Sequence, residues 1–247
     1  MTFVELNAHP VVTDAEFKRL LKVPASFQFT AQMAENAAWS RAWYAEHGRP
    51  WLWAGAVQEC AVAGEVTTLG GQALTSRELA RRFRQARGAV VVAASAGPEA
   101  EAEAAVRWAD DEPDRYYFME TYASAVVEAL IAEARGRLCA WADTRGEVLL
   151  PHYSPGYQGW SEADQVRVLA LLLAQGAAPG PIDVLESGML RPKKSQLAVF
   201  ALAPAGSASA EPADLVPCKY CALIKCEYRR EAHVGSIRSS ELGDRSS

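Results

Sequence analysis

Residues 152–160 combine side chains that suit a polar small molecule better than a hydrophobic core. The stretch has the sequence His-Tyr-Ser-Pro-Gly-Tyr-Gln-Gly-Trp, which places an imidazole and several hydroxyl groups among aromatic rings. Pro155 fixes its own φ and favours extended backbone at Ser154, while Gly156 permits angles closed to other residues. The pattern predicts a rigid, aromatic-walled turn that opens onto a helix N-terminus. A well-packed surface turn without a ligand is the alternative.

Three cysteines form a second group that could carry chemistry. Cys218, Cys221 and Cys226 follow the spacing C-x2-C-x4-C. Thiolates this close together can bind one metal, and their softness selects zinc or an iron–sulfur cluster. A tail of free thiols is the alternative interpretation. The candidates for a fourth ligand are His233, Cys60 and Cys139.

Length and composition exclude several classes of protein. The chain has 247 residues, 50% of them hydrophobic, which is enough for a sizeable core. A formal net charge of −5 and the lack of a long basic run argue against a nucleic-acid partner. The apolar stretches are too short for a membrane span, and the first residues lack the order of a signal peptide. We expect a cytoplasmic protein, where clustered cysteines favour metal or redox chemistry over disulfides.

The first third of the chain is expected to mix helices and strands. Thr13 is placed to cap a helix that ends before Pro24, and a second helix is expected over residues 28–46. Residues 51–68 alternate loosely and predict two strands that meet near Ala63–Gly64. A short helix is expected over residues 75–84.

A buried strand and a long helix are the clearest elements of the middle third. Residues 89–94 form a continuous run of small apolar side chains, and Gly97-Pro98-Glu99 begins a helix after it. Residues 114–134 predict a helix whose core face repeats at three- and four-residue steps. Glu128 lies almost opposite that face, so the pattern alone makes it a solvated glutamate. The core-face residues are Met119, Ala123, Val126, Leu130 and Ala134.

The elements after the turn complete an α+β arrangement. Ser161 is placed to cap a helix that runs to Ala174, and a basic turn over residues 191–194 precedes a strand over 197–202. Strands and helices do not alternate regularly, which favours α+β over a parallel α/β fold. The expected organisation is a domain over 1–203, a linker over 204–217, a cysteine segment over 218–230 and a disordered tail over 231–247.

In order, these motifs resemble the activation domain of vitamin B12-dependent methionine synthase and its short stand-alone relatives. The resemblance depends on the His-Tyr-Ser-Pro-Gly-Tyr turn at 152–157, where the family carries Arg-Pro-Ala-Pro-Gly-Tyr, and on the Leu-Glu-Ser segment at 185–187. It covers residues 88–203 well, the cysteine segment reasonably, and residues 1–87 in outline. It implies a bent antiparallel sheet flanked by helices and a shallow groove for S-adenosylmethionine.

The resemblance also implies which residues contact that ligand. The positions that match the family's binding residues are Glu128, His152, Ser154, Gly156 and Tyr157. His152 departs from the family, which has arginine there. An imidazole does not form the bidentate contact that a guanidinium makes with a carboxylate, and at its ordinary pKa it is largely neutral near pH 7. Weaker or pH-dependent binding is therefore expected, with Arg191 or Lys194 as possible substitutes.

The function implied by the resemblance is the reductive remethylation of cobalamin carried by a partner methionine synthase. An iron–sulfur centre or zinc on the cysteine segment is implied as a hypothesis. One alternative is a reactivator of another corrinoid methyltransferase. A second alternative, favoured by His152, is a non-catalytic metal-binding interaction protein that has lost the ligand.

Overall fold

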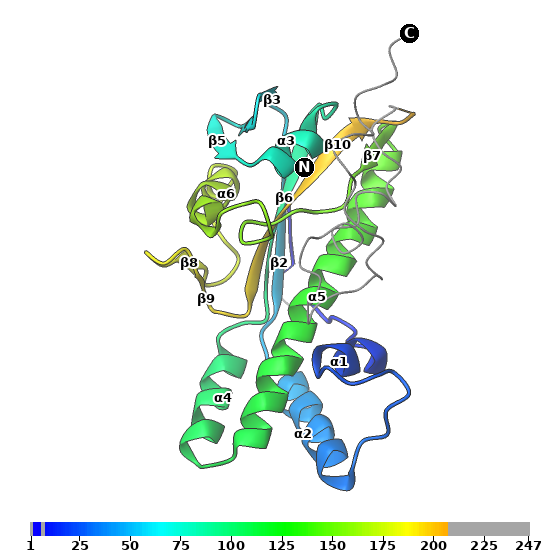
Figure 1. Cartoon of the computed structure of the whole chain (residues 1–247), viewed down its shortest axis with the longest axis vertical. Helices are drawn as coiled ribbons and strands as arrows, with labels where there is room; N and C mark the ends of the chain where they lie inside the picture. Colours follow the sequence, from blue (N-terminus) through cyan, green and yellow to red (C-terminus); the bar gives the residue numbers. More distant parts are fainter. Residues whose placement is uncertain (1, 6–7, 207–247) are drawn as a thin grey trace.

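A five-stranded antiparallel sheet lies at the centre of the fold in the computed structural model, which describes residues 2–5 and 8–206 (Figure 1). The strand order is β1-β2-β6-β10-β7. The bounds are β1 (Thr2–Glu5), β2 (Trp51–Val57), β6 (Gly88–Ser95), β10 (Ser195–Pro204) and β7 (Glu147–Leu149). The long strands β6 and β10 pair along eight positions, from Ser195 opposite Ser95 to Leu202 opposite Gly88.

The sheet separates two hydrophobic cores because successive side chains of a strand point to opposite faces. On β10, Ala198, Phe200 and Leu202 belong to one core, whereas Leu197, Val199 and Ala201 belong to the other. Strand β6 is buried at every position, as its run of small apolar residues predicts. Each face of the central sheet is therefore covered.

Helices cover the first face of the sheet. They are α1 (Asp14–Leu20), α2 (Ala31–His47), α4 (Glu99–Ala109) and α5 (Pro113–Asp143), with α5 running the length of the sheet (Figure 1). The predicted core face of α5 is confirmed, because Met119, Ala123, Val126, Leu130 and Ala134 are all at most 1% exposed.

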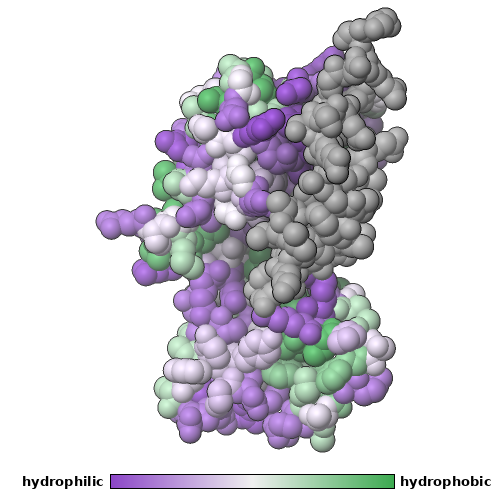
Figure 2. All heavy atoms as spheres, in the orientation of Figure 1, coloured by the Kyte–Doolittle hydropathy of each residue, from purple (hydrophilic) through white to green (hydrophobic). Residues whose placement is uncertain are grey.

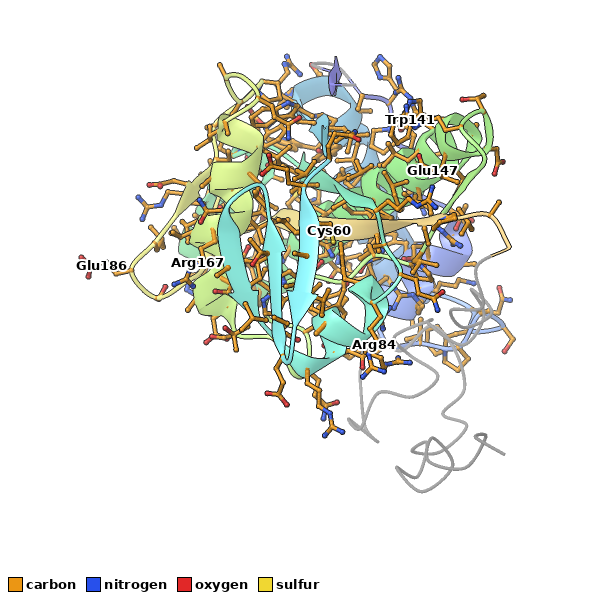
Figure 3. The ribbon with its side chains drawn as sticks, turned by 90° about the horizontal axis from the view of Figure 1, so that it is seen from above. Cys60, Arg84, Trp141, Glu147, Arg167 and Glu186 are labelled. Carbon is orange, nitrogen blue, oxygen red and sulfur yellow. The ribbon has the colours of Figure 1, made fainter. Side chains whose placement is uncertain are left out.

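Smaller elements cover the second face. They are α3 (Arg77–Phe83), the 3-10 turn η1 (Glu162–Asp164), α6 (Gln165–Leu173) and a sheet of β3 (Cys60–Ala63), β4 (Val66–Leu69) and β5 (Gln72–Thr75). Figure 3 shows this small sheet with Cys60 on its edge strand and Glu186 far out on the hairpin of β8 (Asp183–Val184) and β9 (Leu190–Arg191). Residues 51–68 thus contain three strands rather than the two predicted, although the turn at Gly64 is confirmed by its φ of +61°.

The helix starts follow the sequence signals. The hydroxyls of Thr13 and Ser161 accept hydrogen bonds from Glu16 N and Ala163 N, so both predicted caps are confirmed. The second helix begins at Ala31, three residues later than expected, since Thr30 supplies the cap there. The surface seen in Figure 2 is mostly polar, with an apolar area near α1. Within the described residues, none of the helices combines the length and apolar character needed to cross a membrane.

Candidate functional site

The predicted turn continues from β7 along the same edge of β10 and then folds tightly on itself. The backbone of Tyr153 exchanges two hydrogen bonds of 2.9 Å with Val199 of β10. Beyond it, Tyr157 N donates to Ser154 O at 3.0 Å and Gly156 N donates to Trp160 O at 2.9 Å. Gly156 has a φ of +89°, in the left-handed region that favours glycine. These bonds confirm a tight, hydrogen-bonded turn at residues 152–160.

The rear of the turn packs on the second face of the sheet. The rings of Tyr153 and Trp160 stack with centroids 5.6 Å apart, and the guanidinium carbon of Arg82 lies 4.7 Å from the Tyr153 centroid. The Ser76 hydroxyl, which also caps α3, donates to Gly159 O at 2.8 Å. Helix α3 therefore fixes the turn from behind.

A buried carboxylate connects the end of the turn to two neighbouring elements. Asp164 is 5% exposed and accepts hydrogen bonds from Trp160 Nε1 at 2.8 Å and from Thr75 N at 3.3 Å. Arg167 forms an ion pair with the same side chain. The carboxylate thus holds the turn to the end of β5 and to the start of α6.

The front of the turn carries a hydrogen-bonded group of polar side chains. Gln196 Nε2 donates to the Ser154 hydroxyl and to the Tyr157 hydroxyl, each at 3.0 Å. The Tyr157 oxygen also lies 3.2 Å from His152 Nε2. The His152 ring packs 5.5 Å from that of Phe200, which belongs to the core beneath α5. Strand alternation places Gln196 on the same face as Phe200.

The start of β10 continues this polar surface to α5. Lys194 Nζ donates to Ser124 Oγ at 2.9 Å and lies 3.1 Å from Glu120 Oε2. Lys193 Nζ lies 2.7 Å from Glu120 Oε1. Glu128 is half-buried one helical turn beyond Ser124, and residues four apart on a helix share a face. We call the group formed by His152, Ser154, Tyr157, Gln196, Lys194 and Ser124 the polar strip.

The two lysines already have an anionic partner in the structure. Partial burial alone would lower the pKa of Lys193, but its hydrogen bond to Glu120 and the charge of that carboxylate raise the pKa above its ordinary value. Lys194 shares the same carboxylate. Arg191, the other possible substitute for the family's arginine, is exposed on β9. Among the described residues of the polar strip, the group at the turn that could contact a ligand carboxylate is therefore the imidazole of His152 and not a guanidinium.

The structure brings most of the predicted site residues together. His152, Ser154 and Tyr157 share one hydrogen-bonded group, and Gly156 forms the bend between them. Glu128 lies on α5, on the same helix face as Ser124 of the polar strip. Sequence reasoning missed Gln196, which contacts two of these residues. The alternation of side chains along β10 could have identified it, because Gln196 shares a face with Ala198 and Phe200, which are buried beneath α5.

The predicted metal site falls outside the residues that the structure describes. Cys218, Cys221 and Cys226, together with His233, all lie in the range 207–247. Within the described ranges, no group of three His, Cys, Asp or Glu side chains could hold a metal ion. Cys60 and Cys139 are half-buried free thiols that pack on cores at opposite faces of the sheet, and burial raises the pKa of Cys60.

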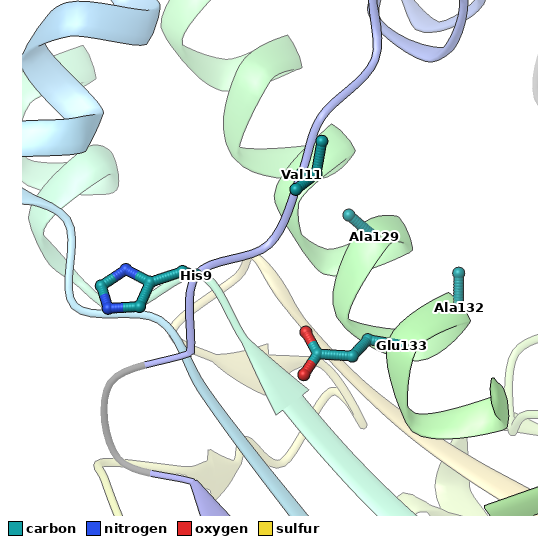
Figure 4. Close-up of a pocket in the computed structure, with 5 residues that line it drawn as sticks. All are labelled: His9, Val11, Ala129, Ala132 and Glu133. Atoms are coloured by element: carbon teal, nitrogen blue, oxygen red, sulfur yellow. The ribbon is translucent and has the colours of Figure 1, made fainter. Parts of the chain in front are cut away.

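Two shallow hollows are lined by residues outside the polar strip. One, of about 440 Å³, is lined by His9, Val11, Ala129, Ala132 and Glu133, and Figure 4 shows the Glu133 carboxylate pointing into it. The other, of about 340 Å³, is lined by Glu101, Ala105, Trp108, Tyr116 and Lys193. Neither contains a residue of the predicted ligand site.

The comparisons with known proteins support the fold. A solved structure described as the crystal structure of the MetH reactivation domain bound to AdoHcy matches with a TM-score of 0.52. The match covers 75% of this chain and 70% of that chain, at 12% sequence identity. No protein-family model and no curated protein matches the sequence. The predicted antiparallel sheet flanked by helices, and the resemblance to the methionine synthase domain at the level of fold, are therefore confirmed.

Proposed function

We propose that the chain binds S-adenosylmethionine along the polar strip and presents its methyl group to cobalamin carried by a partner methyltransferase, in the first instance methionine synthase. The observation that carries this proposal is the cluster of His152, Ser154 and Tyr157 around Gln196, on the side of β10 that faces α5. The neighbour bound to AdoHcy, the demethylated form of the same ligand, supports it.

The chemistry of the described residues suits this ligand. S-adenosylmethionine carries a carboxylate, an ammonium group and a sulfonium centre. His152 and the hydroxyls of the turn can contact the carboxylate, and the Glu128 carboxylate on α5 can contact the cationic groups. A Cβ added at Gly156 would come no closer than 4.0 Å to Glu162, so the bend leaves room beside the backbone. In the reaction, one electron from a separate donor reduces the partner's cobalt, which takes the methyl group as the carbon–sulfur bond breaks and S-adenosylhomocysteine is left.

Calorimetric titration of the purified chain with S-adenosylmethionine and S-adenosylhomocysteine tests ligand binding. We expect saturable binding of both and a loss of at least tenfold in affinity in the Tyr157→Phe variant, which removes a hydroxyl from the centre of the strip. Absence of heat with either ligand at both pH 6 and pH 8 would contradict the proposal.

A second function is favoured by one observation. Within the described residues, Lys194 of the strip and its neighbour Lys193 are both paired with Glu120, and a histidine stands where the family has an arginine. A non-catalytic interaction protein that has lost the ligand would show this pattern. Pull-down of a cobalamin-loaded protein by a chain that does not bind S-adenosylmethionine would favour this second function.

Binding of an iron–sulfur cluster or zinc by Cys218, Cys221 and Cys226 is a separate proposal. Anaerobic purification followed by absorption and EPR spectroscopy distinguishes an iron–sulfur cluster, which absorbs visible light, from zinc, which does not. A triple Cys218, Cys221 and Cys226 to Ser variant is the control, and loss of the metal from this variant is the expected result.

A further inference from the structure

A hollow between α5 and the segment that leads into α1 has no part in the polar strip. It is lined by His9, Val11, Ala129, Ala132 and Glu133, and we call it the α5 hollow. Val11 is 82% exposed, more than any other large apolar side chain that the structure describes. Ala132 is exposed as well, and Ala129, three residues earlier on the same helix face, is half-buried. Apolar side chains gathered around a hollow in this way mark a surface that can bind another segment of chain.

The described part of the chain ends close to the same helix. Ala205 N donates a hydrogen bond of 3.0 Å to the carbonyl three residues after Asp143, where α5 ends. Ala132 lies eleven residues before Asp143, which is about 17 Å along the helix at 1.5 Å per residue. Thirteen residues lead from Ala205 to Cys218, and a chain of that length with coil dimensions spans roughly 20 Å. The cysteine segment therefore reaches the α5 hollow without being stretched.

The cysteine segment has the side chains that this surface would bind. Its sequence, Cys-Lys-Tyr-Cys-Ala-Leu-Ile-Lys-Cys-Glu-Tyr-Arg-Arg, combines an apolar centre at Leu223 and Ile224 with four basic residues and one acidic residue. The hollow offers apolar contacts from Val11 and Ala132, and the carboxylate of Glu133 points into it (Figure 4). Apolar burial and attraction between opposite charges would act together there. We propose that the cysteine segment docks in the α5 hollow, with its apolar centre against Val11 and Ala132.

The other hollow is a poorer match because of where it lies. Trp108 and Tyr116 line it, on the helices that follow the end of β6 at Ser95. Ser95 pairs with the first residue of β10, and β10 is ten residues long, or about 33 Å at 3.3 Å per residue. This hollow is therefore at the opposite end of the sheet from Ala205, roughly twice as far away as the α5 hollow. Proximity favours the nearer surface, since the effective concentration of a tethered segment falls when its tether must be stretched.

Docking at this place would bring the three cysteines close to the proposed ligand site. Ala132 lies one helical turn beyond Glu128, and residues four apart share a helix face. The docking itself requires neither S-adenosylmethionine nor a metal, and the hollow contains no residue of the polar strip. It is therefore tested without ligand, and a failed titration with S-adenosylmethionine would remove the proposed function and leave this result intact.

Photo-cross-linking within the full chain tests the docking. Benzoylphenylalanine, an apolar photoreactive amino acid, replaces Leu223, and mass spectrometry identifies the residues to which it becomes joined on illumination. An equal mixture of 15N-labelled and unlabelled chains separates bonds within one chain from bonds between two chains. We expect bonds within one chain to peptides that contain Val11 or residues 129–133. No product, products without a preference for these peptides, or bonds only between chains would overturn the proposal.

Three controls separate docking from reach and from charge. Gln85 is exposed near the end of the sheet from which the chain leaves, because Arg87 N donates to Leu202 O there, so products at Gln85 as frequent as at Ala132 would overturn the proposal. Ala132→Arg fills the hollow at an exposed helix position and is expected to reduce the yield at least fivefold. Ala102→Arg makes the same change at an exposed position of α4 and should leave the yield unchanged. An equal loss in both arginine variants would mean that repulsion of the basic segment is the cause, which would also overturn the proposal.

Discussion

Lys194 donates a hydrogen bond of 2.9 Å to Ser124, although 70 residues separate them in the chain. This contact fastens the residue just before β10 to the middle of α5. It places Gln196, two residues further along β10, on the same side of the sheet, next to the turn that carries His152. The candidate site thus depends on a junction between a strand and a helix, and its parts can be tested one at a time.

Replacing His152 by arginine is expected to strengthen binding of S-adenosylmethionine about tenfold. A guanidinium adds a bidentate, charge-assisted contact to the ligand carboxylate, where an imidazole offers one hydrogen bond. Calorimetric titration at pH 8 measures the change. Gln158→Arg puts the same charge on an exposed residue of the same turn and serves as the control. An equal gain in both variants would show that the effect is only long-range attraction.

Replacing Glu128 by glutamine is expected to weaken binding roughly tenfold, because the ligand loses a charge-assisted contact to its cationic groups. Glu133→Gln is the matched control, since Glu133 is also half-buried on α5 but points into the hollow beside His9 (Figure 4). The affinity of the Glu133 variant should equal that of the unmodified chain. If the two variants lose affinity equally, Glu128 has no specific contact with the ligand.

Replacing Asp164 by asparagine is expected to lower the free energy of unfolding by about 2 kcal/mol. The substitution removes the charge from a buried acceptor of the Trp160 and Thr75 hydrogen bonds and points an amide group at donors. Urea denaturation measures the loss. Glu162→Gln, an exposed change on the same 3-10 turn, should alter stability by less than about 0.5 kcal/mol. Equal stability of the two variants would contradict the clamping role of Asp164.

The stability supplied by Glu78 is expected to disappear in acid. Burial alone would raise the pKa of Glu78, but the hydrogen bond from Arg81 and the charges of Arg82 and Arg81 lower it below the ordinary value of 4.5. A carboxyl with a lowered pKa stabilises the fold above its unfolded-state pKa and loses that contribution as pH falls through its folded-state pKa. Glu78→Gln should therefore be less stable than the unmodified chain at pH 7, with the difference shrinking as the pH is lowered through the folded-state pKa of Glu78. A difference that stays constant as the pH is lowered would exclude this ion pair as its source.

Periodic patterns predicted the large elements of the fold, and local chemistry explains where they failed. The core face of α5 was predictable because five apolar residues repeat at helical spacing. The predicted end near Ala134 was too early, since Gly136 interrupts the pattern but Leu138 and Ala142 continue the buried face to Asp143. A single glycine costs a helix about 1 kcal/mol, which packing of this face outweighs.

The candidate site was predictable only in part. The turn at residues 152–160 stood out by composition, and its bend follows from the fixed φ of Pro155 and the positive φ open to Gly156. Glu128 came from the family resemblance, because spacing alone made it a solvent-exposed residue. Gln196 was missed because its role depends on which face of β10 meets α5, and that pairing is set by contacts between distant segments.

The alternation of side chains along β10 determines both which residues join each core and which face the polar strip. Even-numbered residues from Lys194 to Leu202 face α5, and odd-numbered residues from Leu197 to Ala201 face α6. A slip of one residue in the pairing of β10 with β6 would exchange these faces, burying the amide of Gln196 under α6 and turning Leu197 towards the turn. Registers of β10 against β6 therefore preserve both the polar strip and the core only in steps of two residues.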